Sequence, residues 1–252
     1  RIFGALAAIL IWAAPTHAIE VAAKQAILID YQTGTVLLEK NADERMTPSS
    51  MSKMATLYKV FERLKEGRLS LEDTLAVSER AWRKQGSKMF VMVNTRVKVE
   101  DLIRGITVQS GNDACVVIAE GLSGTEDAFA GELNELGRKI GMKNTNLVNA
   151  SGWPDPGHVS TARDLAILAT ATIKNFPEFY HYYSEKTFVY NGIKQGNRDP
   201  LLYKDIGADG LKTGHTDEGG YGITASAVRN GRRLVLVVNG LKSVNERARE
   251  AE

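Results

Sequence analysis

The chain has 252 residues, which is enough for one large domain or two modest ones with a buried core. Its 43% hydrophobic and 25% charged residues are ordinary for a globular protein, and the formal net charge is only +2. The dispersed lysines and arginines therefore indicate neither nucleic-acid binding nor attraction to an anionic membrane surface.

Cysteine and histidine usage limits the chemistry further. Cys115 is the single cysteine, so no intrachain disulfide can form, and its apolar neighbours indicate a small buried side chain rather than a nucleophile. The four histidines, at positions 17, 158, 181 and 215, lack metal-ligand spacing. We therefore expect no metal site and no cofactor.

The first 18 residues differ from the rest of the chain. Residues 2–14 form an apolar run behind Arg1, and a segment ending at Ala18 resembles a small-residue cleavage site. The run is too short to span a bilayer comfortably. We predict that residues 1–18 are a secretory signal peptide and that the mature protein is exported; a buried N-terminal helix is the alternative.

The first predicted elements are a β-hairpin and a helix. Residues 26–31 and 35–39 form the hairpin, with Gly34 in its turn. Thr47 and Pro48 then predict a helix start, with the threonine as N-cap and the proline at the first helical position. Apolar residues follow at helical spacing: Met51, Met54, Leu57, Tyr58, Phe61 and Leu64.

The middle of the chain is predicted to be helical. One helix covers residues 101–106, a second begins near Gly111, and a third ends at Gly141. Thr161 is the predicted N-cap of a fourth helix. Residues 148–160 lie between the last two helices and are rich in glycine, proline, asparagine and aspartate, so we expect an ordered surface loop.

The C-terminal part changes to strand patterns. Residues 210–214, 221–229 and 232–239 are short segments of alternating or β-branched residues, and Asn230 with Gly231 predicts a hairpin turn. Strands at both ends with helices between them predict an α+β fold. In it the N- and C-terminal strands form one antiparallel sheet with helices on its faces and a helical subdomain inserted.

Three short motifs occur in a fixed order: Ser50-Met-Ser-Lys53, Ser110-Gly-Asn112 and Lys212-Thr213-Gly214. About one Ser-x-x-Lys and one Ser-x-Asn are expected by chance in such a chain, and Ser243 with Asn245 is a second match to the latter. Lys-Thr-Gly is rarer, at roughly one chain in fifteen or twenty. Their order and spacing favour one shared catalytic site.

Ser50 and Lys53 suit nucleophilic catalysis. They are three residues apart, so on a helix their side chains share a face. A serine hydroxyl needs a base, and a lysine can act as one only if desolvation or a neighbouring cation lowers its pKa. Lys212 is a candidate for that cation. The alternative is a serine at a helix start beside a lysine that extends to solvent.

The other two motifs suit proton relay and binding. The Ser110 hydroxyl could pass a proton to a leaving group, and the Asn112 amide could bind a peptide. The alternative for this pair is an N-cap serine with a turn asparagine. Lys212 and Thr213 suit a terminal carboxylate, and Gly214 allows a substrate backbone to approach. The alternative there is an exposed strand lysine beside a turn.

With their flanking residues, these motifs resemble the serine D-alanyl-D-alanine carboxypeptidases, the low-molecular-mass penicillin-binding proteins of the bacterial periplasm. The similarity runs from about Ala23 to the end and is most specific in residues 48–54, 110–115, 160–164 and 209–216. It implies a β-lactamase/transpeptidase-like fold of the penicillin-recognising superfamily. It also implies removal of the terminal D-alanine from peptidoglycan pentapeptide.

The resemblance implies the catalytic roles. Ser50 would be the acylated nucleophile, Lys53 its base and Ser110 a proton relay. The backbone N–H groups of Ser50 and His215 would form the oxyanion hole. His215 would also contact the substrate.

The same resemblance implies the binding roles. Asn112 would hold the substrate amide, and Lys212 with Thr213 would hold the carboxylate. Gly214 would lie against the substrate backbone. Arg198 matches a family arginine near the site, so it too is expected to bind substrate.

We expect residues 19–252 to form a DD-peptidase catalytic domain that binds peptidoglycan stem peptides and β-lactams in the periplasm. Family members commonly continue into a final helix, a β-rich second domain and an amphipathic membrane anchor. Residues 248–252 end the chain where that helix is expected to begin, so a truncated C-terminal end is expected and membrane attachment stays open.

Three other activities share the motifs. A DD-endopeptidase is one. A β-lactamase is another, although no clear Glu-x-x-x-Asn precedes the Lys212 strand. A penicillin sensor that acylates without turnover is the third, although such sensors usually belong to chains with transmembrane helices.

Overall fold

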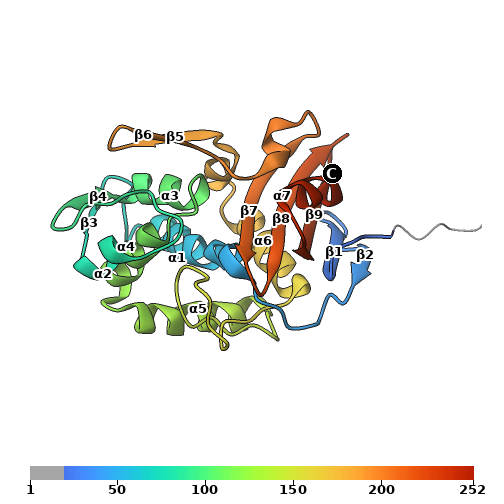
Figure 1. Ribbon diagram of the computed structural model, residues 1–252, viewed down its shortest axis with the longest axis horizontal. Helices are drawn as coiled ribbons and strands as arrows, with labels where there is room; N and C mark the ends of the chain where they lie inside the picture. The colour runs from blue at the N-terminus through green and yellow to red at the C-terminus, as the bar shows by residue number, and fades with distance from the viewer. Residues whose placement is uncertain (1–19) are drawn as a thin grey trace, which may run out of the picture.

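The computed structural model describes residues 20–252, so the predicted signal peptide of residues 1–18 lies outside the described part. The described chain is α+β, with one main sheet beside a group of helices (Figure 1). This confirms the predicted fold class. Within residues 20–252, no helix has both the length and the apolar character that crossing a membrane requires.

The main sheet is antiparallel, and both ends of the chain contribute to it. Its strands lie in the order β2-β1-β9-β8-β7, with bounds β1 Gln25–Asp30, β2 Val36–Lys40, β7 Ala208–Thr216, β8 Gly220–Arg229 and β9 Arg232–Leu241. β1 pairs with β9 over its whole length. The last strand therefore lies between the first strand and β8, and β7 is an edge strand.

Helices cover both faces of this sheet (Figure 1). In β9, Val235 and Val237 pack into the core with α6 (Ala162–Asn175), whereas Leu236 and Val238 belong to the cluster that includes Ala251 of α7 (Val244–Ala251). Successive side chains of a strand point to opposite faces, so this alternation places α6 and α7 on opposite sides.

The remaining helices form the second half of the molecule. They are α1 (Lys53–Lys65), α2 (Glu79–Arg83), α3 (Val99–Thr107), α4 (Asn112–Ser123) and α5 (Glu126–Ile140). The first eight residues of α4 are all buried, so this helix is the centre of the helical part. α1 packs against α4, α5, α6 and β7, and it therefore connects the helices to the sheet.

Short elements complete the fold. Two small two-stranded sheets lie at the edge of the helical part. In one, β3 (Thr74–Ala76) pairs with β4 (Arg96–Lys98) across an insertion that contains α2, and in the other β5 (Thr187–Tyr190) and β6 (Ile193–Gly196) form a hairpin. The described part of the chain also contains three 3₁₀ turns: η1 (Ser49–Ser52), η2 (Tyr180–Ser184) and η3 (Pro200–Tyr203).

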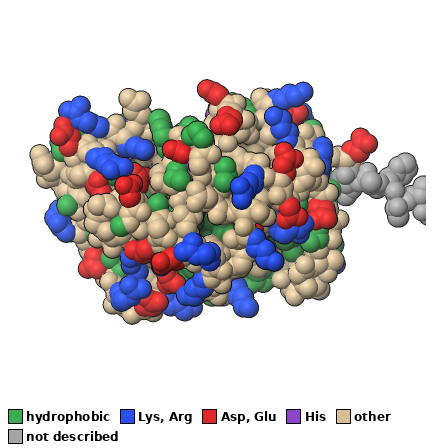
Figure 2. Space-filling model, turned by 90° about the horizontal axis from the view of Figure 1, so that it is seen from below, with side chains coloured by type: hydrophobic (Ala, Val, Ile, Leu, Met, Phe, Trp, Pro, Cys, Tyr) green, Lys and Arg blue, Asp and Glu red, His purple; other side chains and the backbone are tan. Residues whose placement is uncertain are grey.

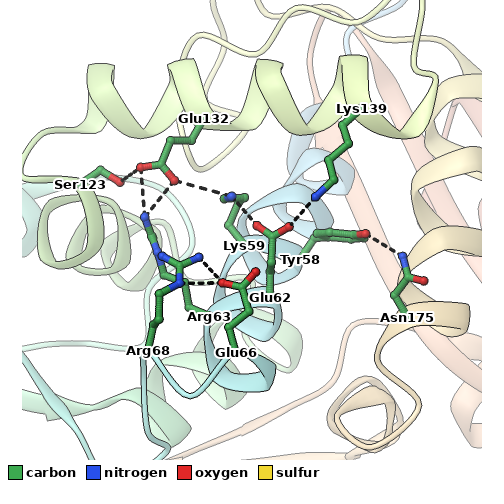
Figure 3. A network of polar contacts seen from close by, with 10 residues as sticks. All are labelled: Tyr58, Lys59, Glu62, Arg63, Glu66, Arg68, Ser123, Glu132, Lys139 and Asn175. Atoms are coloured by element: carbon green, nitrogen blue, oxygen red, sulfur yellow. Dashed lines mark hydrogen bonds and ion pairs between the residues drawn. The ribbon is translucent and has the colours of Figure 1, made fainter.

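An ion-pair network joins α1 to α5 (Figure 3). Glu132 of α5 accepts two hydrogen bonds from Arg63 of α1, at 2.9 and 3.0 Å, and one from Ser123. Glu62 of α1 binds Lys139 at 3.3 Å.

Acidic and basic side chains are interspersed over the face seen in Figure 2, so charge on this face is balanced locally.

The structure corrects three expectations. The α-helix does not begin at Pro48: a 3₁₀ turn comes first and α1 begins at Lys53. The last helix begins at Val244 rather than near Ala248, with the Ser243 side chain accepting a hydrogen bond from the N–H of Glu246. Residues 148–160 are not simply a surface loop, because several of them are buried, as described below.

Candidate active site

Ser50 lies in the 3₁₀ turn η1, which packs between strand β7 and the loop of residues 148–160. Ser49 before it has φ of 50°, in the left-handed region. A Cβ at Gly214 of β7 would come within 3.0 Å of the Ser49 Cβ, and one at Gly152 would come within 2.0 Å of the Ser49 carbonyl oxygen. The two glycines allow this close packing, which explains why a 3₁₀ turn precedes α1.

Lys53 is fully buried beneath Ser50. Its Nζ donates hydrogen bonds to Ser50 Oγ at 2.7 Å, to Asn112 Oδ1 at 2.7 Å and to the Ser151 carbonyl at 2.5 Å. The ammonium therefore uses all three of its protons on fixed acceptors. This arrangement confirms that Ser50 and Lys53 contact each other, as their spacing predicts.

Burial lowers the pKa of Lys53 to about 8, and the positive charges of Arg198 and Lys84 contribute to the same shift. Lys212, the cation expected to lower it, is not among the main causes. The pKa of Lys212 is itself lowered well below its usual value by burial and by the charge of Lys53. Because repulsion between two cations is mutual, the expected effect of Lys212 on Lys53 stays a prediction.

The second motif connects α3 to α4. Ser110 has φ of 59°, Gly111 is the N-cap of α4, and Ser110 lines the same cleft as Ser50. The Asn112 amide is occupied, because its oxygen accepts from Lys53 and its nitrogen donates to the Gln85 carbonyl at 2.8 Å. Asn112 is 6% exposed and lies beneath the cleft wall.

The third motif lies on the edge strand β7. Thr213, Gly214 and His215 line the cleft, whereas Lys212 is 2% exposed and lies behind them. An edge strand leaves part of its N–H and C=O groups unpaired with the sheet. The strand therefore presents backbone groups beside Ser50, as an oxyanion hole or an extended peptide would require.

The cleft has a volume of about 430 Å³. Ten residues line it: Ser50, Ser87, Ser110, Arg198, Thr213, Gly214, His215, Tyr221, Val244 and Arg247. Of the nine residues predicted from the sequence, six line the cleft, and Lys53, Asn112 and Lys212 lie directly behind its wall. No carboxylate is among the lining residues.

Four lining residues were not anticipated. Ser87 accepts a hydrogen bond from Arg198 at 2.5 Å, and Tyr221 stacks on His215 with ring centroids 4.0 Å apart. Val244 and Arg247 come from α7. The only sequence signal for α7 was the second Ser-x-Asn match, which proves to contain the cap of this helix.

Ser87 belongs to a segment held by the residue after the second motif. Asp113 is 1% exposed and accepts the backbone N–H groups of Met89, Phe90 and Val91 at 2.9 to 3.2 Å. The Ser87 carbonyl accepts the N–H of Asn112 at 2.7 Å. The start of α4 therefore positions one wall of the cleft.

The loop of residues 148–160 contributes a buried histidine. His158 Nδ1 accepts the N–H of Val148 at 3.2 Å, so its Nε2 carries the proton and donates to Ser52 Oγ at 3.0 Å. Burial, with the charge of Lys53, lowers the pKa of His158 to about 4. The imidazole is therefore neutral near pH 7 and ties the loop to the Ser50 turn.

Cys115 is buried, as expected, and burial raises the pKa of its thiol to about 12. Such a thiol is a poor nucleophile. Among residues 20–252 there is no group of three or more histidine, cysteine, aspartate or glutamate side chains arranged to hold a metal ion.

Solved structures similar to this chain define its class. Penicillin binding protein 5 from Haemophilus influenzae matches with a TM-score of 0.90 and 41% identity, over 95% of this chain and 70% of that chain. The D-alanyl-D-alanine carboxypeptidase DacD from Francisella tularensis matches with a TM-score of 0.91 and 34% identity, over 98% and 71%. The fold is thus that of the penicillin-binding DD-peptidases.

Sequence relatives agree. D-alanyl-D-alanine carboxypeptidase DacA of Haemophilus influenzae is 42% identical over 92% of this chain, and DacA of Escherichia coli K12 is 41% identical over 92%. Residues 12–243 match the peptidase S11 family of D-alanyl-D-alanine carboxypeptidases, and the chain belongs to that family. It spans about three fifths of the length of these curated relatives, 61% and 59%.

Proposed function

We propose that this protein is a serine DD-carboxypeptidase that removes the terminal D-alanine from peptidoglycan pentapeptide through an acyl-enzyme on Ser50. The observation that carries the proposal is the 2.7 Å hydrogen bond between Ser50 Oγ and a buried Lys53 of lowered pKa, at the base of a cleft without lining carboxylates. Relatives that share the fold bear the names of such enzymes.

Acylation begins when neutral Lys53 takes the proton of Ser50. With a pKa of about 8, roughly a tenth of Lys53 is neutral at pH 7. The Ser50 oxygen attacks the carbonyl of the penultimate D-alanine, and the N–H groups of Ser50 and His215 stabilise the oxyanion. The C–N bond then breaks, and Ser110 passes a proton to the amine of the departing D-alanine.

Deacylation reverses these roles. Water attacks the ester on Ser50, and a base accepts a proton from this water. The Ser50 oxygen then leaves and takes a proton from Lys53. The products are the shortened peptide and free enzyme, so atoms and charge balance over the cycle. A β-lactam would enter by the same attack on its amide and remain bound as an ester.

Substrate binding in this proposal uses the cations and the strand edge. Lys212, Thr213 and Arg198 attract the terminal carboxylate, and β7 pairs with the extended peptide beside Gly214. Asn112 already holds Lys53 with its oxygen. The Asn112 nitrogen donates to the Gln85 carbonyl, so Asn112 can bind the substrate amide only if the substrate replaces Gln85 in this hydrogen bond.

The partners and the location follow from this activity. The substrate is a peptidoglycan stem peptide, penicillins are covalent inhibitors, and the mature protein works in the periplasm after export.

One experiment separates this activity from its alternatives. The purified protein is incubated with a muropeptide ending in D-Ala-D-Ala and, separately, with labelled penicillin. We expect release of D-alanine and a slowly hydrolysed penicillin adduct. Rapid penicillin hydrolysis would instead identify a β-lactamase, and a stable adduct without D-alanine release would identify a sensor. Cleavage of cross-linked dimers in preference to pentapeptide would identify an endopeptidase.

A further inference from the structure

A hydrogen-bond chain runs from His158 through Ser52 to the Ser49 carbonyl, directly behind the nucleophile. The Ser49 carbonyl accepts the Ser52 hydroxyl at 2.9 Å, and Ser52 Oγ lies 3.0 Å from Nε2 of His158. All three residues are no more than 2% exposed. Burying such polar groups costs free energy unless each is hydrogen-bonded, so the position of every proton in the chain matters.

The donors of this hydrogen-bond chain run in one direction. His158 Nδ1 accepts the N–H of Val148 at 3.2 Å, so the ring proton is on Nε2. The Ser52 hydroxyl has a single proton, which it donates to the Ser49 carbonyl. Ser52 Oγ therefore accepts from His158, and each hydrogen bond strengthens the next.

The chain ends on a peptide group that also carries one donor of the proposed oxyanion hole. A peptide group is planar, so the direction of the Ser49 carbonyl fixes the direction of the Ser50 N–H. A Cβ added to Gly152 would lie 2.0 Å from the Ser49 carbonyl oxygen and 2.8 Å from Ser52 Oγ, so the loop packs directly on this hydrogen bond. Turning the Ser50 N–H therefore requires breaking the bond from Ser52.

Ser49 also contacts the strand that carries the second donor. Its hydroxyl oxygen lies 3.2 Å from Oγ1 of Thr216, the residue after His215 on β7. Ser49 therefore lies between the two segments whose N–H groups stabilise the oxyanion in the proposed reaction. Its orientation affects how these two donors lie relative to each other.

We propose that His158 and Ser52 are positioning residues that orient the oxyanion hole, because they hold the Ser49–Ser50 peptide with its N–H toward the carbonyl under attack. Neither residue lines the cleft, and both act through the Ser49 carbonyl. Pre-oriented donors stabilise the charge of the transition state more than they stabilise the bound substrate. This inference rests on the proposed acyl-enzyme on Ser50.

The test compares Ser52→Ala with Thr56→Val. The buried Thr56 hydroxyl donates to the carbonyl of Ala150 in the same loop at 2.7 Å, so its partner is not the Ser49–Ser50 peptide. Each substitution removes one buried hydroxyl hydrogen bond to its partner, so each should lower the thermal midpoint by about 2–4 °C. Stopped-flow kinetics with a fluorescent penicillin separates the dissociation constant of the first complex from the acylation rate constant.

We expect Ser52→Ala to lower the acylation rate constant on the order of 10- to 100-fold, with less than about a threefold change in the dissociation constant. Thr56→Val should keep the wild-type value of both constants. The proposal is overturned if the two variants are slowed equally, if Ser52→Ala keeps the wild-type rate constant, or if its loss lies in the dissociation constant.

Two variants of His158 test the other end of the chain. Phenylalanine keeps a ring but no donor, whereas the glutamine amide keeps an N–H donor. His158→Phe should slow acylation about tenfold and His158→Gln less than about threefold. The double variant of His158→Phe and Ser52→Ala should be no slower than Ser52→Ala alone, because both changes break one chain. Additive losses, or equal losses with phenylalanine and glutamine, would contradict the chain.

A measurement without ligand checks the position of the ring proton. Burial and the charge of Lys53 lower the pKa of His158 to about 4, and the charge of Asp155 opposes this shift. Because the pKa is lowered, the ring stays neutral above that pH. The nitrogen-15 resonances of His158 should therefore show a neutral ring with its proton on Nε2 from pH 5 to pH 9. A proton on Nδ1, or titration near a pH of about 6.5, contradicts the chain.

The two proposals fail separately. If the wild-type protein releases D-alanine but Ser52→Ala and Thr56→Val are acylated alike, only the positioning role is overturned. If Ser52→Ala is selectively slowed but the wild type releases no D-alanine, only the proposed carboxypeptidase reaction is overturned.

Discussion

Lys53 combines properties that rarely occur together in a lysine. It is fully buried, it donates three short hydrogen bonds, and its pKa is lowered to about 8. Neutral and charged forms are therefore both accessible near physiological pH, which general-base catalysis requires. The protein holds this lysine by α1, by the start of α4 and by the loop that contains Ser151.

The first prediction concerns the pH dependence of acylation. Since the neutral form of Lys53 is the base, and its fraction rises as pH passes through about 8, the acylation rate constant for penicillin should increase about tenfold between pH 7 and pH 9. Stopped-flow measurement with a fluorescent penicillin checks this.

The control for this prediction is Lys59→Met on the same helix. Lys59 pairs with Glu62 and lies away from the cleft, so its replacement should leave the profile unchanged. Lys53→Met should lower the rate constant by a factor of about 10² to 10⁴. A rate constant that is flat from pH 7 to pH 9 in the wild type would exclude Lys53 as the base.

At the scale of single residues, the sequence predicts the site residues that lie within motifs. It does not predict those that the fold brings to the cleft from other parts of the chain. The spacing of Ser50 and Lys53 places them on one side of a turn, so their contact is predictable. Arg247 and Ser87 carry no motif, and they reach the cleft only because α7 and the segment before α3 fold against it. The burial of Lys212 was not predictable either, because it depends on how β7 packs against η1 and η2.

At the scale of elements, the turn η1 depends on close contact with the loop at Gly152. This glycine has φ of 75°, and an added Cβ would lie 2.0 Å from the Ser49 carbonyl oxygen. Gly152→Ala should therefore displace the Ser50 turn. A displacement of about 1 Å at the nucleophile is expected to lower the acylation rate constant on the order of 100-fold.

Gly157→Ala is the matched control for this loop. Its added Cβ would meet nothing nearer than 3.2 Å, so acylation should change little. Acylation kinetics and the thermal midpoint are measured for both variants. Wild-type acylation in Gly152→Ala would contradict the proposed coupling between the loop and the turn.

The network between α1 and α5 makes a prediction about stability (Figure 3). Arg63 has a side chain only 11% exposed and pairs with Glu132 at 2.9 Å. Glu132→Gln leaves this guanidinium with a neutral partner, so the free energy of unfolding should fall by about 1–2 kcal/mol. Urea unfolding followed by circular dichroism measures it.

Glu79→Gln provides the comparison, because the Glu79–Arg83 pair is 64% and 69% exposed and should contribute almost nothing. Penicillin acylation should remain at the wild-type rate in both variants, since neither residue lines the cleft. Equal loss of stability in the two variants would show that burial of the Arg63 pair is unimportant.

Elements with strong local signals were predictable. The Asn230–Gly231 turn has positive φ at both residues, of 51° and 75°, and Thr161 caps α6, both as expected. The start of α1 was not predictable. Thr47 and Pro48 are residues that usually start a helix, but tertiary contacts at Gly152 and Gly214 favour a 3₁₀ turn there. Local propensity was overridden by packing.

At the scale of the whole molecule, β9 joins the two ends of the chain. It lies between β1 and β8, and Val235, Val237 and Val238 are completely buried. A chain ending at Arg229 lacks β9 and should not fold cooperatively, because β1 and β2 lose their connection to the rest of the sheet. Thermal unfolding followed by circular dichroism tests this.

A chain ending at Lys242 is the matched control. It keeps all five strands and loses only α7, so it should fold with lower stability and with impaired acylation, because Val244 and Arg247 are removed from the cleft. A cooperative transition in the chain ending at Arg229 would contradict the central role of β9.

The arrangement of strands at both ends of the chain made the overall fold predictable, because such strands can close into one sheet. The position of β9 between β1 and β8, and the placing of α7 on the cleft, depend on long-range pairing that no local pattern contains. The strand order could therefore not be derived from the sequence pattern.

The acyl-enzyme on Ser50 is the central claim, and intact-protein mass spectrometry with peptide mapping tests it most directly. After incubation with penicillin, the wild-type protein should gain the mass of one penicillin on the peptide that contains Ser50, and Ser50→Ala should gain none. An adduct on another residue, or an adduct that persists in Ser50→Ala, would contradict the account.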